Sequence, residues 1–399
     1  MLSHMYPGPV NPTAGIFVHE QVRALIALGH DVRVVSPTPW APPLAARWRA
    51  HRSVPAGDRV DGVPVLYPRK LSLPGGRLGH RNGEAMLLAI RGPLRRLRRR
   101  WPYDLIHAQM LVPDGWAAAR LGAGLGVPVV ATAHRADVLD VPSRGSASRA
   151  RVAEAVGAID QIVTVSRAIR DACQAVGRPR RAVAVVPNGA DTRVFLPRER
   201  AEARARLGLP DDGPVVSYVG KLVPRKGVDA LIEALGLLAR RPGGAPLLAA
   251  VGIGELRPAL EARVRELGLG ERVRFAGKVP HDEVAWWIAA GDVFVLPSLS
   301  EGLPTVVCEA MACARPVVAT AVDGTPEIVE DGETGFLVPP RDPRALAAAL
   351  ARVLDDPTLA DRLGARAHER ALERYTWAAN AERMEALYAA LLPDPARTG

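Results

Sequence analysis

Two carboxylates eight residues apart, Glu301 and Glu309, are the first candidates for chemistry in this sequence. They lie in "DVFVLPSLSEGLPTVVCEAM", which predicts a strand, a loop leaving its carboxyl end, and a helix with Pro304 near its first position. Glu301 then belongs to the loop, and Glu309 lies about two turns into the helix. A carboxylate can accept two hydrogen bonds from neighbouring hydroxyls. The pair therefore fits a ribose at one end of a diphosphate and a hexose at the other.

The diphosphate itself needs positive groups, and the same region supplies them. Backbone N–H groups at a helix N-terminus favour phosphate, which predicts a role for the amides around Thr305 and Val306. In "YVGKLVPRKGVD", Lys221 and Lys226 lie in a loop after another expected strand, opposite that helix N-terminus. A pair of lysines in a loop is usually only solvated. Because the acidic loop and the helix N-terminus lie in the same half of the chain, we favour a phosphate site.

Short apolar runs alternate with helical stretches along the chain, which is typical of doubly wound α/β layers. The first half contains "HDVRVVSP", "PYDLIHAQ", "VPVVATAH" and "DQIVTVS". The second half contains "PVVSYVGKL", "APLLAAVG", "RVRFAGKV", "DVFVLPS" and "RPVVATAV". Two such sets predict an α/β protein with two Rossmann-like domains, each built on a parallel sheet.

The boundary between these domains is best placed at "VVPNGADTRVFLP", where proline, asparagine and glycine interrupt the pattern. We expect domains at residues 1–190 and 191–375, and a final helix in 376–399 that could pack back on the first domain. The sequence reaches the turn-rich "PGPVNPTAG" within a few residues. Either the first strand is curtailed, or the true start lies upstream of Met1.

Composition places the chain among globular proteins. It has 399 residues, of which 48% are hydrophobic and 24% charged, so length alone favours two domains. No apolar run reaches the roughly 18 residues of a membrane span, and no signal peptide is recognised, so we expect a cytoplasmic protein. The three cysteines lack the paired short spacings of a zinc site, and buried thiols are the better interpretation.

The formal charge of +10 is distributed unevenly. Residues 1–190 hold 26 Lys and Arg against 12 Asp and Glu (+14), whereas residues 191–399 hold 26 against 30 (−4). A cluster of arginines between Arg91 and Arg100 could attract anionic lipid or an acidic substrate, or could be a solvated helix face. Nucleic acid is disfavoured, because only Trp101 adjoins the cluster and no recognisable module is present.

In combination, these motifs resemble a known family. "GKLVPRKG", then "SEGLPTVVCEAMACARPVVAT" and "DGTPEIVEDGETGFLVPPRDP" look like the C-terminal domain of family 4 glycosyltransferases of GT-B fold, whose hallmark is an acid, seven residues and an acid. "GIFVHEQVRALIALGHDVRVVSP", "DLIHAQ", "VVATAHRADV" and "VPNGADTRVF" resemble the rest of such a chain. The opening "PTAGIFVHEQV" is most similar to members that build capsular, teichuronic or other exopolysaccharides.

The resemblance implies a role for each matching residue. Glu309 would hold the ribose and Glu301 the hexose hydroxyls, while Lys221 and Lys226 neutralise the diphosphate. His134, with Asp137 behind it, would face the donor sugar near its anomeric carbon. The remaining donor-binding residues would act chiefly through backbone groups: Gly15, Gly220, Lys278, Val279, Gly302, Leu303, Pro304, Thr305 and Val306.

Three positions depart from the family pattern. Lys221 stands where arginine is usual, so a bidentate grip becomes a point charge. Arg135 replaces the glycine that usually follows the active-site histidine, and it could crowd the cleft or meet an anionic acceptor. Asp323, in "DGTPE", stands in place of a double glycine.

The resemblance also implies a reaction. A hexose would pass with retention from a UDP- or GDP-type sugar to a glycan or lipid-linked acceptor, across a cleft between the domains, without metal or cofactor. The arginine cluster would hold the enzyme at the inner membrane face. The alternatives are a sugar-nucleotide epimerase or phosphorylase of the same fold, and a basic protein that binds lipid or nucleic acid without catalysis. The sequence names neither base, sugar, acceptor nor oligomeric state.

Overall fold

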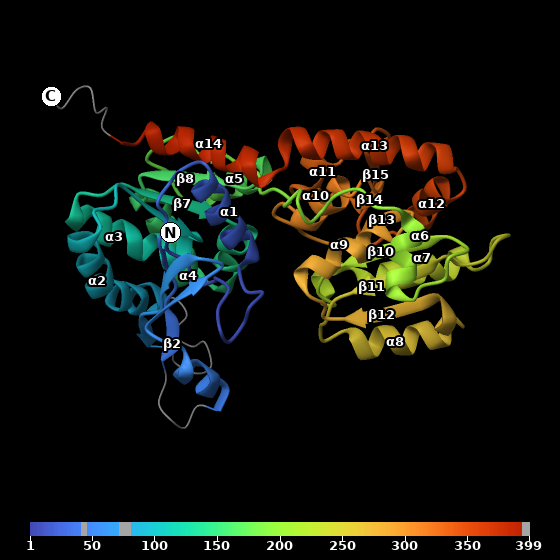
Figure 1. The fold of residues 1–399 in the computed structure, drawn as a ribbon, viewed down its shortest axis with the longest axis horizontal. Helices are drawn as coiled ribbons and strands as arrows, with labels where there is room; N and C mark the ends of the chain where they lie inside the picture. The colour runs from blue at the N-terminus through green and yellow to red at the C-terminus, as the bar shows by residue number, and fades with distance from the viewer. Residues whose placement is uncertain (41–45, 72–80, 393–399) are drawn as a thin grey trace. The chain divides into compact units, whose positions relative to one another are not determined.

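The structure is a computed structural model that describes residues 1–40, 46–71 and 81–392. The chain divides into two compact units (Figure 1). The first unit contains Met1–Pro187 and Asn380–Gly399, and the second contains Asn188–Ala379. The chain therefore leaves the first unit after Pro187 and returns to it at Asn380.

The first unit alternates strands and helices. Its strands are β1 (Val34–Val35), β2 (Thr38–Trp40), β3 (Gly57–Val60), β4 (Val63–Leu66), β5 (Arg69–Leu71), β6 (Ile106–Gln109), β7 (Val129–Ala133), β8 (Gln161–Thr164) and β9 (Ala184–Val185). Its helices are α1 (Ile16–Ala27), α2 (Asn82–Arg100), α3 (Trp116–Leu125), α4 (Ser146–Ala158), α5 (Arg167–Val176) and most of α14 (Trp377–Ala389). Short helical turns are η1 (Ala46–Ser53), η3 (Leu111–Gly115), η4 (Ala136–Asp140) and η5 (Pro142–Arg144).

Parallel pairing dominates this unit. Strands β6, β7, β8 and β9 pair in that order, and β1 pairs with β4, to which β3 adds the antiparallel edge. Leu2 forms parallel bridges to both Val35 and Ala108, so it lies between β1 and β6. Every residue of β6, β7 and β8 is buried, as expected when helices cover both faces of a parallel sheet.

The C-terminal helix α14 supplies part of the first unit's core. Its residues Ala381, Met384 and Tyr388 are buried in one cluster with Val130 and Val163 of the sheet. The Tyr388 hydroxyl also lies 2.7 Å from Nδ1 of the buried His107 on β6. Helix α14 thus contributes to the apolar core beside the sheet of the first unit.

The second unit contains a six-stranded parallel sheet. Its strands are β10 (Val215–Val219), β11 (Leu247–Val251), β12 (Val273–Gly277), β13 (Val293–Leu296), β14 (Val317–Thr320) and β15 (Gly335–Val338). Its helices are α6 (Arg200–Leu207), α7 (Val228–Leu238), α8 (Arg257–Glu266), α9 (His281–Ala289), α10 (Thr305–Ala312), α11 (Thr325–Ile328), α12 (Pro343–Leu354) and α13 (Pro357–Arg374), with short turns η6 (Pro224–Lys226) and η7 (Gly270–Arg272).

The strand order of this sheet determines where a ligand can bind. The order is β12-β11-β10-β13-β14-β15, so the chain runs outward in one direction from β10 and in the other from β13. Open α/β sheets bind ligands at this switch point, beyond the carboxyl ends of the strands. The loops that follow β10 and β13 carry Lys226 and Glu301, respectively.

Among the helices that the structure describes, none combines the length and the apolar content that crossing a membrane requires.

Candidate active site

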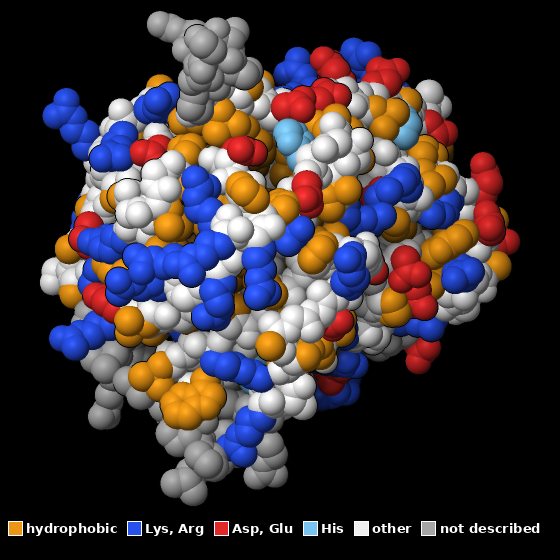
Figure 2. All heavy atoms as spheres, turned by 60° about the vertical axis from the view of Figure 1, so that its left-hand side comes forward, with side chains coloured by type: hydrophobic (Ala, Val, Ile, Leu, Met, Phe, Trp, Pro, Cys, Tyr) orange, Lys and Arg blue, Asp and Glu red, His pale blue; other side chains and the backbone are white. Residues whose placement is uncertain are grey.

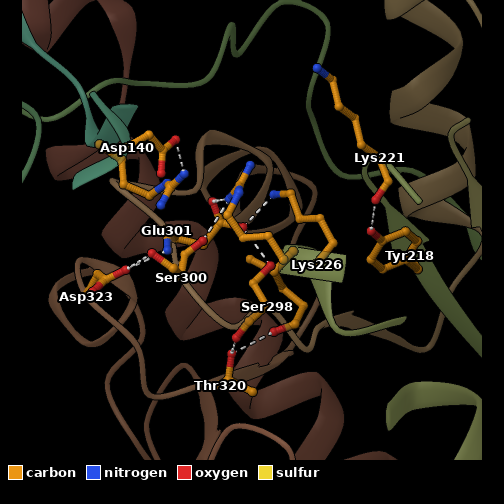
Figure 3. Close-up of polar contacts among 12 residues, drawn as sticks. Asp140, Tyr218, Lys221, Lys226, Ser298, Ser300, Glu301, Thr320 and Asp323 are labelled. Carbon is orange, nitrogen blue, oxygen red and sulfur yellow. Dashed lines mark hydrogen bonds and ion pairs between the residues drawn. The ribbon is translucent and has the colours of Figure 1, made fainter. Parts of the chain in front are cut away.

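The two loops at the switch point of the second unit meet through an ion pair. The Lys226 ammonium lies 2.5 Å from Oε1 of Glu301, and the Ser298 hydroxyl donates to the same oxygen at 2.6 Å (Figure 3). The Glu301 and Lys226 side chains are only 8% and 13% exposed. A carboxylate removed from water needs such partners, because an unpaired buried charge costs several kcal/mol. The structure thus brings together two of the residues that sequence analysis placed in one site.

Two further side chains hold the Glu301 loop in place. Asp323 accepts hydrogen bonds from the Ser300 hydroxyl at 2.6 Å and from the Glu301 backbone N–H at 2.8 Å. Arg225 donates to the Ser300 carbonyl at 2.8 Å and lies 3.6 Å from Oε2 of Glu301. Asp323 has a φ of 43°, a conformation that glycine or a short polar residue tolerates. The residue that replaces a family glycine therefore keeps the glycine-like backbone and adds two hydrogen bonds.

A glycine lets the β10 loop approach the end of β13. Gly227 has a φ of 59°, and a Cβ there would lie 2.1 Å from the carbonyl oxygen of Pro297. Any other residue would separate the Lys226 loop from the strand that leads to Glu301. The ion pair thus depends on a position where only glycine fits.

Lys221 does not join Lys226. Its side chain is exposed, and Figure 3 shows its ammonium pointing away from the Lys226–Glu301 pair. The backbone of Lys221 is held by a hydrogen bond, because the Tyr218 hydroxyl donates to the Lys221 carbonyl at 3.0 Å. The expectation that both ammonium groups act together at the helix N-terminus is therefore not met by these side-chain positions.

Helix α10 begins where sequence analysis placed it. Pro304 occupies the N-cap position, and no side chain forms a capping hydrogen bond there. The first turn carries no acidic residue, so the positive end of the helix dipole is not offset by a nearby carboxylate of that turn. Glu309 is half-buried farther along the helix. A phosphate at this N-terminus would find donors that no capping side chain occupies.

The other residues expected to bind the donor lie on the same edge of the second unit or on a loop of the first. Leu303 and Pro304 are buried, whereas Gly302, Thr305 and Val306 are half-buried. After β12, Lys278 is exposed and Val279 half-buried, and Gly220 follows β10. Gly15 precedes α1 in the first unit with a φ of 61°, and a Cβ there would lie 2.1 Å from the Met5 carbonyl oxygen. The roles assigned to these residues stay predictions.

His134 follows β7 in the first unit and is held on both sides. Its Nε2 lies 3.1 Å from Oε1 of Gln109, and its ring meets the Phe17 ring edge-on at 5.0 Å between centroids. Burial lowers the pKa of His134 to about 4. The imidazole is therefore neutral at physiological pH.

Asp137 supports the His134 loop through the backbone, and no hydrogen bond joins it to the imidazole. Its carboxylate accepts from the backbone N–H groups of His134 at 2.9 Å, Leu111 at 2.9 Å and Val112 at 3.3 Å. Burial raises the pKa of Asp137 to about 7, although these three donors pull in the other direction. Arg135, which follows His134 in the sequence, forms an ion pair with Asp140, with 2.5 Å between Nη2 and Oδ2.

Several residues beside these loops are not predicted by the sequence motifs. Arg225 and Gln109 lay inside motifs that were recognised, but nothing in their spacing distinguished them. His4 contacts the fully buried Asp114 through its ring and its backbone N–H. The lysines that were recognised do carry a compositional signal. The chain has lysine only at positions 70, 221, 226 and 278, and three of these are expected donor-site residues.

Among the residues that the structure describes, neither the cysteines nor a cluster of metal-binding side chains forms a second site. All three cysteines are buried free thiols, and burial raises the pKa of Cys173 to about 12. Within the described part of the chain, no group of three or more His, Cys, Asp or Glu side chains is placed to hold a metal ion.

Comparison with known proteins identifies the family. Residues 14–194 match the family described as Glycosyltransferase Family 4, and residues 199–370 match Glycosyl transferases group 1. TuaC of Bacillus subtilis, named for teichuronic acid biosynthesis, is 30% identical over 359 residues, covering 88% of this chain and 87% of that protein. The chain belongs to the family 4 glycosyltransferases.

A further relative and two solved structures are also similar to this chain. D-inositol 3-phosphate glycosyltransferase 1 of Catenulispora acidiphila is 32% identical over 368 residues, covering 86% of this chain and 84% of the relative. Sucrose-phosphate synthase of Thermosynechococcus elongatus superposes with a TM-score of 0.79 at 28% identity, covering 95% and 94% of the two chains. HepE of Anabaena, solved with UDP-glucose, shares the fold with a TM-score of 0.73 at 22% identity, covering 98% of each. The fold is GT-B, with two Rossmann-like domains.

The lowered pKa of His134 predicts an acid-sensitive contribution to stability. In the unfolded chain an imidazole takes up a proton near pH 6.5, but the folded protein keeps His134 neutral down to about pH 4. The unfolded state therefore binds more protons between these values, and the free energy of unfolding falls as the pH is lowered through this window. We expect His134→Gln to remove up to about 1.4 kcal/mol per pH unit from that slope.

Urea unfolding of the parent and of His134→Gln at pH 7.5, 6.0 and 5.0 measures this difference directly. Other titrating groups, Asp137 included, occur in both proteins and cancel in the comparison. Parallel curves for the two proteins across this range would show that His134 titrates normally in the folded state.

Proposed function

We propose that this glycosyltransferase moves a hexose from a nucleoside-diphosphate sugar to a glycan or lipid-linked acceptor with retention at the anomeric carbon. The observation that carries the proposal is the Lys226–Glu301 pair at the switch point, beside the uncapped start of α10. A nucleotide-sugar donor is also supported by the UDP-glucose bound to HepE, which has the same fold. The similarity to TuaC favours a role in cell-surface polysaccharide or glycolipid synthesis.

Carboxylates would recognise the sugar hydroxyls of the donor, and positive groups would recognise its diphosphate. Glu309 holds the ribose hydroxyls and Glu301 those of the hexose, because carboxylates accept hydrogen bonds from hydroxyls. Lys226, the α10 N-terminus and the exposed side chain of Lys221 stabilise the charge that develops on the departing diphosphate. These groups supply the positive field without a metal ion or a cofactor. The acceptor hydroxyl attacks from the face that the nucleotide leaves.

Donor binding requires the ion pair to exchange partners. In the structure, Oε1 of Glu301 is occupied by Lys226 and Ser298. Breaking such a buried pair costs about 3–5 kcal/mol when one partner is simply removed. A nucleotide sugar avoids this cost because its phosphate receives Lys226 while a sugar hydroxyl donates to Glu301. The diphosphate and the hexose are therefore recognised together rather than independently.

The charge of Lys226 is testable by turnover. Lys226→Met removes the ammonium but keeps the length of the side chain, and we expect turnover to fall by about 10²-fold or more. Arg362→Met, which removes an exposed charge from α13 of the same unit, is the matched control and should keep parental turnover. Thermal melts of both variants show whether they remain folded. A folded Lys226→Met variant with near-parental turnover would exclude this lysine from the mechanism.

The acceptor side of the proposal rests on charge. Residues 1–190 carry a net +14, and the face that Figure 2 turns forward shows a gathering of Lys and Arg side chains. On α2, an exposed row of arginines accompanies Leu88, whose exposure is 75%; the row consists of Arg91, Arg95, Arg96, Arg99 and Arg100. Arg98 is not part of this row, because it is half-buried and donates to the Tyr103 carbonyl at 2.5 Å. We propose that this row holds the enzyme at the inner face of the membrane, near an anionic or lipid-phosphate-linked acceptor.

Vesicle co-sedimentation tests the membrane proposal. Each arginine near an anionic surface contributes about 1 kcal/mol, and the attraction is screened within roughly 8–10 Å at ordinary salt. We therefore expect binding to anionic vesicles at low salt, weaker binding at high salt and little binding to neutral vesicles. The test variant replaces four exposed arginines of α2 with glutamine: Arg91, Arg95, Arg96 and Arg99.

A variant of equal charge change controls for net charge. It replaces four exposed arginines of the second unit with glutamine: Arg240, Arg272, Arg344 and Arg362. The α2 variant should lose vesicle binding, and the control variant should retain most of it. If the parent ignores anionic vesicles at low salt, or both variants bind alike, the row on α2 is only a solvated helix face.

A further inference from the structure

A chain of four hydrogen bonds runs through the first unit from His134. Nε2 of His134 lies 3.1 Å from Oε1 of Gln109, and Nε2 of Gln109 donates to Oε1 of Gln21 at 2.6 Å. Nε2 of Gln21 then donates to Oδ1 of Asn380 at 2.8 Å. Nδ2 of Asn380 donates to the backbone carbonyl of Pro187 at 2.7 Å. All five residues belong to the first unit.

The last member of the chain fixes the direction of every bond. The Pro187 carbonyl can only accept, so Asn380 must present its NH₂ group there and its oxygen to Gln21. The same requirement passes to Gln109, whose oxygen must face His134. Reversing any one amide would place two donors or two acceptors against each other. Because Gln109, Gln21 and Asn380 are only 2%, 3% and 1% exposed, bulk water cannot repair such a mismatch.

This direction determines which nitrogen of His134 carries the proton. The oxygen of Gln109 accepts, so Nε2 of His134 must donate, and a neutral imidazole then has its lone pair on Nδ1. Nδ1 makes no hydrogen bond with the residues that the structure describes. Asp137 contacts only the backbone of His134 and does not compete for the ring.

We propose that Gln109, Gln21 and Asn380 are positioning residues that hold His134 in its Nε2–H tautomer, so that Nδ1 accepts a hydrogen bond from a substrate hydroxyl. The part about substrate rests on the proposed function. A neutral amide orients the ring without the effect of a carboxylate, which would favour the charged imidazolium. An acceptor at Nδ1 suits a sugar hydroxyl and repels a phosphate oxygen, which makes His134 a contact for the sugar rather than for the diphosphate.

The tautomer can be observed in the protein without substrate. Long-range ¹H–¹⁵N spectra of the histidine-labelled protein distinguish protonated from unprotonated ring nitrogens, and His134→Gln identifies the His134 signals among the nine histidines. We expect a protonated Nε2 and an unprotonated Nδ1 that do not change between pH 8 and pH 5.5. A protonated Nδ1, or a mixture of the two forms, would overturn the proposal.

A remote variant tests the relay itself. Asn380→Leu removes its far anchor, so Gln21 and Gln109 can reverse, and the His134 signals should move toward a mixture of tautomers. Gln161→Leu is the matched control, because Gln161 is a buried glutamine of the same unit that donates to the carbonyls of Ile162 and Ala182. It should lower the melting temperature without changing the His134 signals. If Asn380→Leu does not fold, Gln21→Met removes the middle of the chain instead. An unchanged tautomer in the folded relay variant would overturn the proposal.

Turnover separates this proposal from the function on which it builds. Gln109→Glu places a carboxylate against Nε2 and should stabilise the imidazolium, so that turnover gains an acid limb absent from the parent above pH 5.5. A parental tautomer in a protein that transfers no sugar from any UDP- or GDP-sugar would reject the proposed function and keep the relay. An active enzyme whose Gln109→Glu variant shows the parental pH profile, or whose His134 carries the proton on Nδ1, would reject the relay.

Discussion

The ion pair between Lys226 and Glu301 is the interaction around which the second unit is arranged. Two buried charges at the edge of a sheet are tolerated only when every charged atom has a partner. The strand order brings β10 and β13 side by side, Gly227 lets their loops approach, and Asp323 fixes the backbone of the acidic loop. Each of these features lies outside the pair, and each is needed to keep it in place.

The two units position their polar side chains in different ways. In the second unit, Lys226 and Glu301 hold each other through opposite charges, and in the proposed function a charged ligand would replace this pairing. In the first unit, His134 is held by neutral amides that end at a backbone carbonyl. Burial keeps the ring uncharged and the neutral amide does not oppose this, whereas a carboxylate partner would raise the pKa of His134. In the function that we propose, the charged pair of the second unit would meet the diphosphate and the hexose of the donor, and the neutral His134 of the first unit would meet a sugar hydroxyl.

Much of the fold could be predicted from the sequence, because apolar runs that alternate with helical stretches specify parallel sheets. That Lys226 and Glu301 belong to one site could be predicted, because the carboxyl ends of parallel strands share one edge, whereas the ion pair between them was not predicted. The direction of Lys221 could not be predicted, since an exposed side chain is not constrained by spacing. The contact of Asn380 could not be predicted either. Its partner Gln21 lies 359 residues away in the sequence, and the two meet only because α14 returns to the first unit.

Asp137 and Asp323 show where reasoning from a motif reaches its limit. The motif predicts Asp137 as a support behind His134, whereas the carboxylate accepts hydrogen bonds from backbone N–H groups and none from the ring. Asp323 was recognised only as a departure from a glycine pattern, whereas its carboxylate holds Ser300 and Glu301. A motif gives the neighbourhood of a residue, but the hydrogen bonds depend on backbone conformation that the motif does not specify.

The most direct test of the account is the binding of a nucleoside diphosphate and of the intact nucleotide sugar to three proteins. A panel of UDP- and GDP-sugars scored by thermal stabilisation first identifies the donor, since a ligand that binds only the folded state raises the melting temperature. Calorimetry then compares the parent with Glu301→Ala and Glu309→Ala. The account predicts that Glu309→Ala weakens both ligands, whereas Glu301→Ala chiefly weakens the sugar. Equal losses for both ligands in both variants would contradict the assignment of one carboxylate to the ribose and the other to the hexose.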